Sequence, residues 1–178
     1  MVENIKNALS SFAETVVTFL GFSPDAANFF YVFLISMIPI IELRGAIPVA
    51  YALGLSPLNS YIVAVIGNMI PVPFILLLIT PICNLLKKTK LLAWFPRWLD
   101  AKVEKNRHKV EKYAFWGLYL FVAIPLPGTG AWTGSLIASF LGFDFKRSFL
   151  SVLGGVLTAG IIMTLLSFGA FDMIRNLF

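Results

Sequence analysis

The amino-acid sequence predicts an all-α integral membrane protein. Of its 178 residues, 58% are hydrophobic and 13% are charged, whereas soluble domains carry about 25% charged residues. Three stretches, residues 45–86, 113–143 and 148–171, contain no charged residue, and each can hold a membrane span of about 20 residues. We therefore expect a single membrane domain over residues 1–178 that crosses the bilayer more than once.

The N-terminal segment, residues 2–22, predicts an amphipathic helix. Apolar residues recur in it at helical spacing, while Glu3 and Glu14 lie on the opposite face. Such a helix is typical of the membrane interface. A crossing helix is the alternative, and it would place Glu14 near the middle of the bilayer.

Residues 87–113 form a basic connector. Nine of the fourteen Lys and Arg residues lie between Lys87 and Lys112. Cytoplasmic loops of membrane proteins carry such an excess of basic residues, so we expect residues 87–112 to be cytoplasmic, in the plasma membrane of a prokaryote. Because membrane orientation alone accounts for this charge, no nucleic-acid partner is expected.

The chain has the same layout on either side of the connector, in residues 26–86 and 114–173. Each part begins with a short apolar run, continues through a segment rich in Gly and Pro, and ends in a long apolar run. A shift of 88 residues aligns six identical residues without a gap: Pro39 with Pro127, Ala50 with Ala138, Leu53 with Leu141, Gly54 with Gly142, Ser60 with Ser148, and Gly67 with Gly155.

This layout predicts two re-entrant helical hairpins, each followed by a crossing helix. With residues 87–112 inside the cell, the first hairpin enters from outside and the second from inside, so the two halves form an inverted repeat. Inverted repeats with discontinuous helices near the bilayer midplane are typical of transport sites. The alternative is a pair of ordinary kinked transmembrane helices.

Two charged residues lie in the first hairpin, in the stretch IELRGAIPVA. Glu42 and Arg44 each cost about 2.5–3.5 kcal/mol if they are placed at mid-depth. Residues two apart do not face each other on a regular helix, so we expect the backbone to unwind near Pro39, Gly45 and Pro48. The pair would then line a polar cavity. The alternative places both at headgroup level, with Arg44 reaching water.

The second hairpin carries the uncharged motif PLPGTGAWTGS. Its glycines let main-chain N–H groups approach a ligand, and a half-helix N-terminus there favours an anion. The alternative is close helix packing through small residues. We assign substrate binding to residues of both motifs: Pro39, Glu42, Arg44, Gly45, Pro127, Gly128, Thr129, Gly130, Trp132, Thr133, Gly134 and Ser135.

The stretches SMIPIIELRGAIPVAYALG and AIPLPGTGAWTGSLIASFLGF resemble the paired motifs of the small multi-drug export proteins, over about residues 35–169. This resemblance implies a membrane transporter. The hairpin layout is also similar to that of the DedA and VTT membrane proteins, which are implicated in moving phosphate-headed lipids. The DedA-type hairpin carries an arginine, and the second hairpin here has Trp132 and Thr133 but no arginine.

We favour transport of an amphipathic substrate with a phosphate head group. Arg44 would repel a cation by up to about 4 kcal/mol at close range, whereas an arginine and a glycine-rich turn suit phosphate oxygens. Glu42 is expected to exchange protons and to couple transport to the proton gradient. Export of cationic amphipathic drugs is the alternative, and a membrane scaffold without transport is the second.

The remaining expectations concern partners and chemistry. Hairpins of half depth leave polar backbone that needs cover, so we expect a homodimer surrounded by membrane lipid. The sequence shows no Cys and His cluster for a metal and no His near a Ser, so neither an enzyme nor a cofactor is expected.

Overall fold

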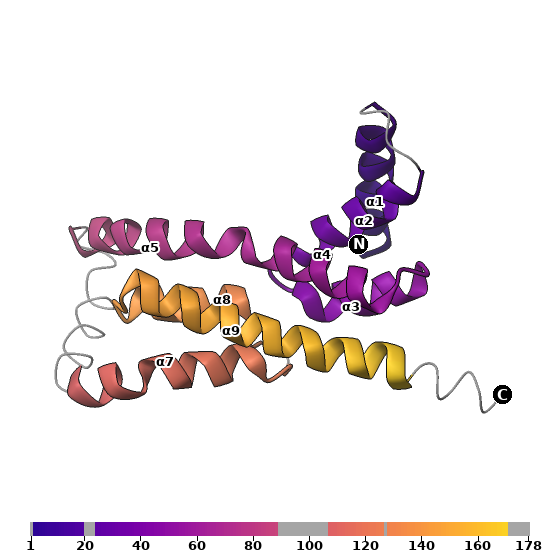
Figure 1. The fold of residues 1–178 in the computed structure, drawn as a ribbon. Helices are drawn as coiled ribbons and strands as arrows, with labels where there is room; N and C mark the ends of the chain where they lie inside the picture. The colour runs from indigo at the N-terminus through magenta and orange to yellow at the C-terminus, as the bar shows by residue number, and fades with distance from the viewer. Residues whose placement is uncertain (1, 20–23, 89–106, 127, 171–178) are drawn as a thin grey trace. The chain divides into compact units, whose positions relative to one another are not determined.

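The computed structural model describes residues 2–19, 24–88, 107–126 and 128–170, which are helical and contain no strand (Figure 1). The all-α prediction is therefore confirmed for this part of the chain. The helices are α1 (Val2–Phe19), α2 (Pro24–Ser36), α3 (Glu42–Ala52), α4 (Pro57–Met69), α5 (Pro71–Lys88), α7 (Arg107–Ala123), α8 (Ala131–Phe140), α9 (Phe145–Thr164) and the π-helix η1 (Leu165–Ala170).

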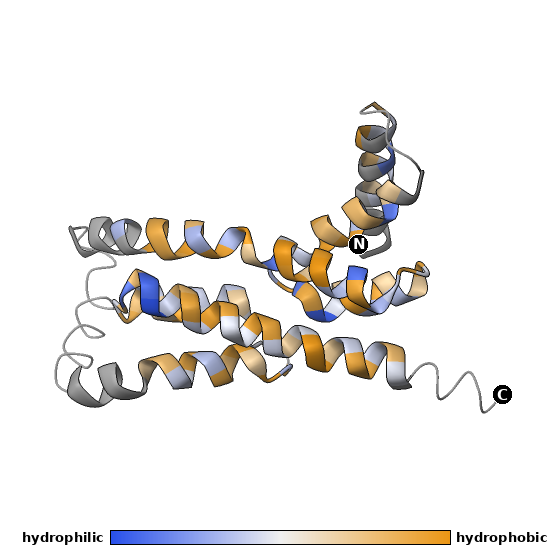
Figure 2. Cartoon of the chain, viewed as in Figure 1, coloured by the Kyte–Doolittle hydropathy of each residue, from blue (hydrophilic) through white to orange (hydrophobic). Residues whose placement is uncertain are grey.

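Two stretches are long and apolar enough to cross a membrane. They are Pro57–Ile79, with 23 residues in α4 and the start of α5, and Phe145–Gly169, with 25 residues in α9 and η1. Figure 2 shows apolar residues along most of both stretches. Both lie where the sequence predicts a crossing helix. Shorter apolar helices precede them at Ala26–Ser36 and Ala114–Ala123.

The chain divides into two compact units. Unit 1 comprises Met1–Asn68 and Ala159–Phe178, and unit 2 comprises Met69–Thr158. In unit 1, α2 packs against both α1 and α3, and η1 contacts α3. In unit 2, α8 packs against α5 and α7. The predicted single domain and its repeat boundaries stay predictions.

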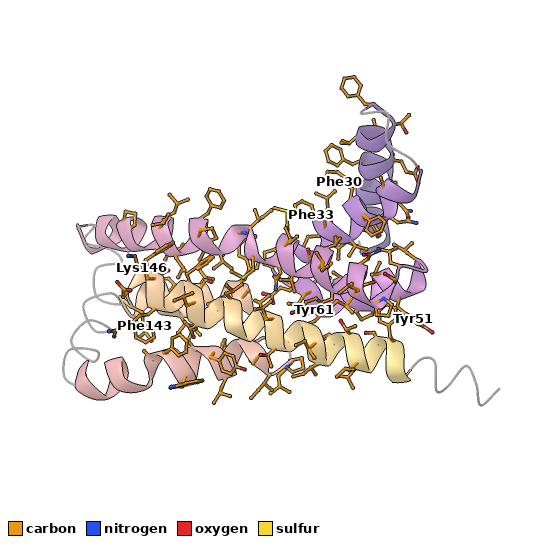
Figure 3. All side chains as sticks on the ribbon, in the orientation of Figure 1. Phe30, Phe33, Tyr51, Tyr61, Phe143 and Lys146 are labelled. Atoms are coloured by element: carbon orange, nitrogen blue, oxygen red, sulfur yellow. The ribbon has the colours of Figure 1, made fainter. Side chains whose placement is uncertain are left out.

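Aliphatic side chains form the buried core of unit 1, and partly exposed aromatic rings contact one another beside it. The rings of Phe30 and Phe33 stack on α2 with centroids 6.1 Å apart (Figure 3), and Tyr51 of α3 meets Phe168 of η1 edge to face at 5.0 Å. Val32 of α2 and Ile47 of α3 are fully buried.

Hydrogen bonds join α7 to α9 in unit 2. The Tyr119 hydroxyl lies 2.8 Å from that of Thr158, and the Ser151 hydroxyl donates to the carbonyl oxygen of Phe115 at 2.6 Å. Polar side chains on an otherwise apolar helix are satisfied here by a neighbouring helix, as a membrane interior requires.

Helices α3 and α8 end with the same hydrogen bond at positions 88 residues apart. The N–H of Leu55 donates to the carbonyl of Ala50 at 3.0 Å, and the N–H of Phe143 donates to that of Ala138 at 2.9 Å. In each case the preceding glycine has a positive φ, 77° at Gly54 and 67° at Gly142. A residue in this left-handed conformation commonly closes a helix, and glycine adopts it without steric cost.

The next helices, α4 and α9, also begin alike. The Ser56 hydroxyl accepts a hydrogen bond from the N–H of Asn59 at 3.4 Å, and the Asp144 carboxylate accepts one from the N–H of Arg147 at 3.1 Å. Ser and Asp are favoured at the N-cap, the residue before the first helical residue. Their side chains accept hydrogen bonds from N–H groups that have no partner within the first helical turn.

Three expectations involve residues near the limits of the described ranges. The predicted N-terminal helix is present over Val2–Phe19. Of the basic connector, Lys88 ends α5 and Arg107 begins α7, while residues 89–106 lie outside the described residues. Pro127 lies outside them as well.

Candidate functional site

Glu42 begins α3 in the interior of unit 1. Its side chain is 3% exposed, and its N–H donates to the carbonyl of Ile38 at 2.9 Å. Its φ of 50° lies in the left-handed region, and it is the one described non-glycine residue with a positive φ. That conformation costs about 1–2 kcal/mol and persists where the surrounding structure holds it, often at a functional site.

Arg44 lies two residues after Glu42 and is half-buried. The negative charge of Glu42 acts on the Arg44 guanidinium, and an arginine stays protonated at neutral pH. The first motif thus brings one buried carboxylate and one guanidinium under each other's electrostatic influence.

The break between the hairpin helices includes Pro39 but neither of the other two residues at which the sequence predicts unwinding. Residues 37–41 form the turn, in which Pro39 and Ile40 are exposed, Ile40 by 95%. The expected unwinding at Gly45 and Pro48 is wrong, because both residues continue α3. The N–H of Gly45 donates to the carbonyl of Ile41 at 3.0 Å, and the Ile41 side chain fills the place of a side chain at Gly45.

The second motif forms a turn between α7 and α8. Gly128 and Gly130 have φ of 81° and 141°, so both positions favour glycine. The Thr129 hydroxyl lies 2.9 Å from the carbonyl oxygen of Ile124 and 2.8 Å from that of Leu126, and so holds the turn together. Gly130 is buried and directly precedes the first residue of α8. The turn therefore delivers main-chain N–H groups at a helix N-terminus.

In α8, Gly134 packs against α7, whereas Ser135 carries a buried polar group. A Cβ atom at Gly134 would lie 2.7 Å from Cγ2 of Val122, so this glycine serves the close packing of α8 on α7. The Ser135 hydroxyl is fully buried and has no hydrogen-bond partner among the described residues. Trp132 and Thr133 are partly exposed. Ser135 is thus the buried polar group of this motif that a ligand could satisfy.

The predicted site residues fall into two sets. Pro39, Glu42, Arg44 and Gly45 belong to unit 1, and the described residues from Gly128 to Ser135 belong to unit 2. That both sets bind one substrate stays a prediction. Among the described residues, no group of three or more His, Cys, Asp and Glu side chains is placed to hold a metal ion.

Two buried polar residues lie outside the predicted set of site residues. Asn68 is fully buried, and neither its amide oxygen nor its amide nitrogen has a hydrogen-bond partner within the described ranges. The buried hydroxyl of Ser148 is likewise without a partner there. A signal for Asn68 was available, because this strongly polar side chain lies at the centre of the apolar stretch Pro57–Ile79.

Comparison with known proteins identifies the family. A family model described as "Putative small multi-drug export protein" matches residues 42–162, which is more than half of the chain. The matched range begins at Glu42 and includes the glycine-rich turn. Searches of curated proteins and of solved structures gave no match. The family and the two long apolar stretches together indicate a membrane protein. The chain belongs to the small multi-drug export protein family.

Proposed function

We propose that this protein is a transporter that moves an amphipathic substrate with an anionic phosphate head group across the membrane, as a lipid carrier or flippase. The family description, that of an export protein, supports a transport role rather than a catalytic one. The observation that carries the choice of substrate is Arg44, a half-buried guanidinium beside the buried Glu42. A guanidinium presents a planar fork of donors that matches phosphate oxygens.

The turn before α8 supports an anionic head group independently. Gly130 is buried at the N-terminus of a ten-residue helix, where N–H groups and the helix dipole favour negative charge. The buried Ser135 hydroxyl adds a donor that lacks a partner among the described residues. A cationic head group would need a carboxylate, and Glu42 is the one carboxylate among the predicted site residues of the two motifs.

The proposed architecture is an inverted repeat of two re-entrant hairpins, α2–α3 and α7–α8, each followed by a crossing helix. The matching helix ends and helix starts 88 residues apart support a repeat. Cysteine accessibility tests the inversion. A cysteine at Gly54 should react with an impermeant maleimide from outside, and one at Gly142 from inside. Reaction at Gly54 from inside alone would contradict the proposal.

Glu42 is our candidate for proton coupling. It is the buried carboxylate of the first motif, at a residue with a left-handed backbone whose N–H donates to the carbonyl of Ile38. Exchange of a proton there would change the net charge of the Glu42 and Arg44 pair by one unit. Such a change would alter the affinity for a charged head group and so link transport to the proton gradient.

A homodimer is proposed as the working assembly. Ile40 at the tip of the first turn is almost fully exposed, and hairpins of half depth leave polar backbone to be covered. Mass measurement of the purified protein in mild detergent tests this. A monodisperse monomer that retains transport would count against the dimer.

Export of cationic amphipathic drugs is the second candidate, and the family description favours it. Native mass spectrometry of the purified protein distinguishes the two. We expect a co-purifying phospholipid or polyprenyl phosphate that is lost in Arg44→Ala. The matched control is Arg147→Ala, which removes an exposed arginine of α9 and should retain the lipid. Saturable binding of a quaternary-ammonium dye that needs Glu42 and ignores Arg44 would instead establish drug export.

A further inference from the structure

Asn68 occupies the centre of the first crossing stretch. Pro57–Ile79 has 23 residues, and Asn68 is the twelfth from either end. Its side chain is fully buried, and both polar atoms of its amide lack a hydrogen-bond partner among the described residues. An unsatisfied amide is costly in an apolar interior, so such a residue requires an explanation.

The equivalent position in the second crossing stretch is apolar. Shifted by 88 residues, Asn68 aligns with Val156, which is also fully buried. The neighbouring positions match as well, since Gly67 and Gly155 both lie against the preceding apolar helix of their own unit. A valine therefore suits this place in a crossing helix, and packing alone does not require an asparagine.

The main chain breaks its regular helix beside Asn68. Helix α4 ends at Met69, and α5 begins at Pro71. A continuous helix would place the N–H of residue 71 on the carbonyl of Gly67, but proline has no N–H. The carboxyl end of α4 also carries the negative end of the helix dipole. The amide oxygen of Asn68 and this dipole both favour a positive charge, and the amide nitrogen of Asn68 remains a donor.

We propose that Asn68 is the central ligand of a binding site for a small monovalent cation, of which sodium is the first candidate. Discontinuous helices of transporters bind such ions through main-chain carbonyls and the carboxyl ends of half-helices. The role of this cation as a coupling ion beside the proton exchanged at Glu42 rests on the proposed transport function. The binding site itself does not.

Thermal unfolding of the full chain in mild detergent tests the site. Sodium chloride is compared with choline chloride at equal ionic strength, and potassium and lithium chloride test selectivity. We expect sodium at about 100 times its Kd to raise Tm by about 5–10 °C. Asn68→Val should abolish this shift while Tm in choline stays equal or rises. Asn59→Val, on the exposed face of the same helix, should keep the shift.

Several results would overturn the proposal. They are equal Tm of the unaltered protein in sodium and choline, a sodium shift that survives in Asn68→Val, and a lower Tm of that variant in choline, which would assign Asn68 a structural role. If Asn68→Val does not fold, Asn68→Asp takes its place. An added carboxylate should tighten sodium binding at least tenfold by equilibrium dialysis with radioactive sodium, and unchanged affinity would reject the site.

The cation and cargo proposals fail separately. Sodium binding is measured without any substrate, whereas native mass spectrometry of co-purifying lipid is carried out without sodium. A protein that retains lipid and ignores sodium keeps the transport proposal and loses the cation site. A protein that binds sodium through Asn68 and retains no phosphate lipid does the reverse.

Discussion

The carbonyl oxygen of Phe33 lies 2.6 Å from the position that a Cβ atom at Gly67 would occupy. The Ser36 hydroxyl lies against the same position and donates to that carbonyl at 2.7 Å. Helix α4 therefore approaches the main chain of α2 directly, and a methyl group at residue 67 can be accommodated only by a shift of one helix.

Gly67→Ala is expected to destabilise unit 1. Because the obstructing atom belongs to the main chain, the cost should resemble that of overpacking, about 1–3 kcal/mol. Thermal unfolding in detergent measures it. Gly117→Ala is the control, since a Cβ atom there meets nothing within 4 Å and should be neutral or slightly stabilising. Equal Tm of the two variants would show that the close approach of α4 and α2 does not contribute to stability.

Gly155→Ala should have the same effect in unit 2. A Cβ atom there would lie 2.9 Å from the carbonyl oxygen of Tyr119 and 2.6 Å from Cβ of Val122. We expect a loss of about 1–3 kcal/mol, as at Gly67. Gly154→Ala is a graded comparison, because its nearest contacts are ring atoms of Tyr119 at 3.2 and 3.3 Å. If Gly154→Ala costs as much as Gly155→Ala, the carbonyl contact is not the cause.

Much of the fold could be predicted from local sequence signals. The long apolar runs located both crossing stretches, and the aligned glycines at 54 and 142 coincide with helix ends of positive φ. Gly45 and Pro48 misled because their residue types disfavour a helix interior, whereas both lie in α3 among residues that are buried in unit 1, Ala46 and Ile47. Local propensity is a weak guide where tertiary contacts decide.

The candidate site was predicted less completely. Glu42 and Arg44 were predicted because charges are rare in the apolar stretch, and in the structure Glu42 is buried and Arg44 is half-buried after the turn at residues 37–41. Asn68 is absent from the predicted site residues, because its residue type does not reveal whether its amide has partners. That property depends on three-dimensional packing and has no periodic signature in the sequence.

The backbone at Glu42 gives a prediction that separates strain from charge. Glu42→Ala and Glu42→Gly both remove the buried carboxylate, but only glycine adopts a φ of 50° without steric cost. We expect the free energy of unfolding of Glu42→Gly to exceed that of Glu42→Ala by about 1–2 kcal/mol. The greater freedom of glycine in the unfolded chain reduces this difference by about a few tenths of a kcal/mol. Chemical or thermal unfolding of the two variants measures this difference. A more stable alanine variant would mean that φ at residue 42 is negative in the folded protein.

Glu42→Gln tests the proposed proton coupling. The amide keeps the size and hydrogen-bonding capacity of the carboxyl group but exchanges no proton, so folding should persist and gradient-driven transport should fall at least tenfold. The assay uses proteoliposomes with an imposed pH gradient and fluorescent phosphatidic acid, whose movement between leaflets is followed by dithionite quenching. Glu14→Gln is the control, since Glu14 is an exposed carboxylate of α1 and its loss should leave the driven rate unchanged. A Glu42→Gln variant that still responds fully to the gradient would assign proton exchange to another residue, while loss of movement both with and without the gradient would indicate that Glu42 takes part in substrate binding itself.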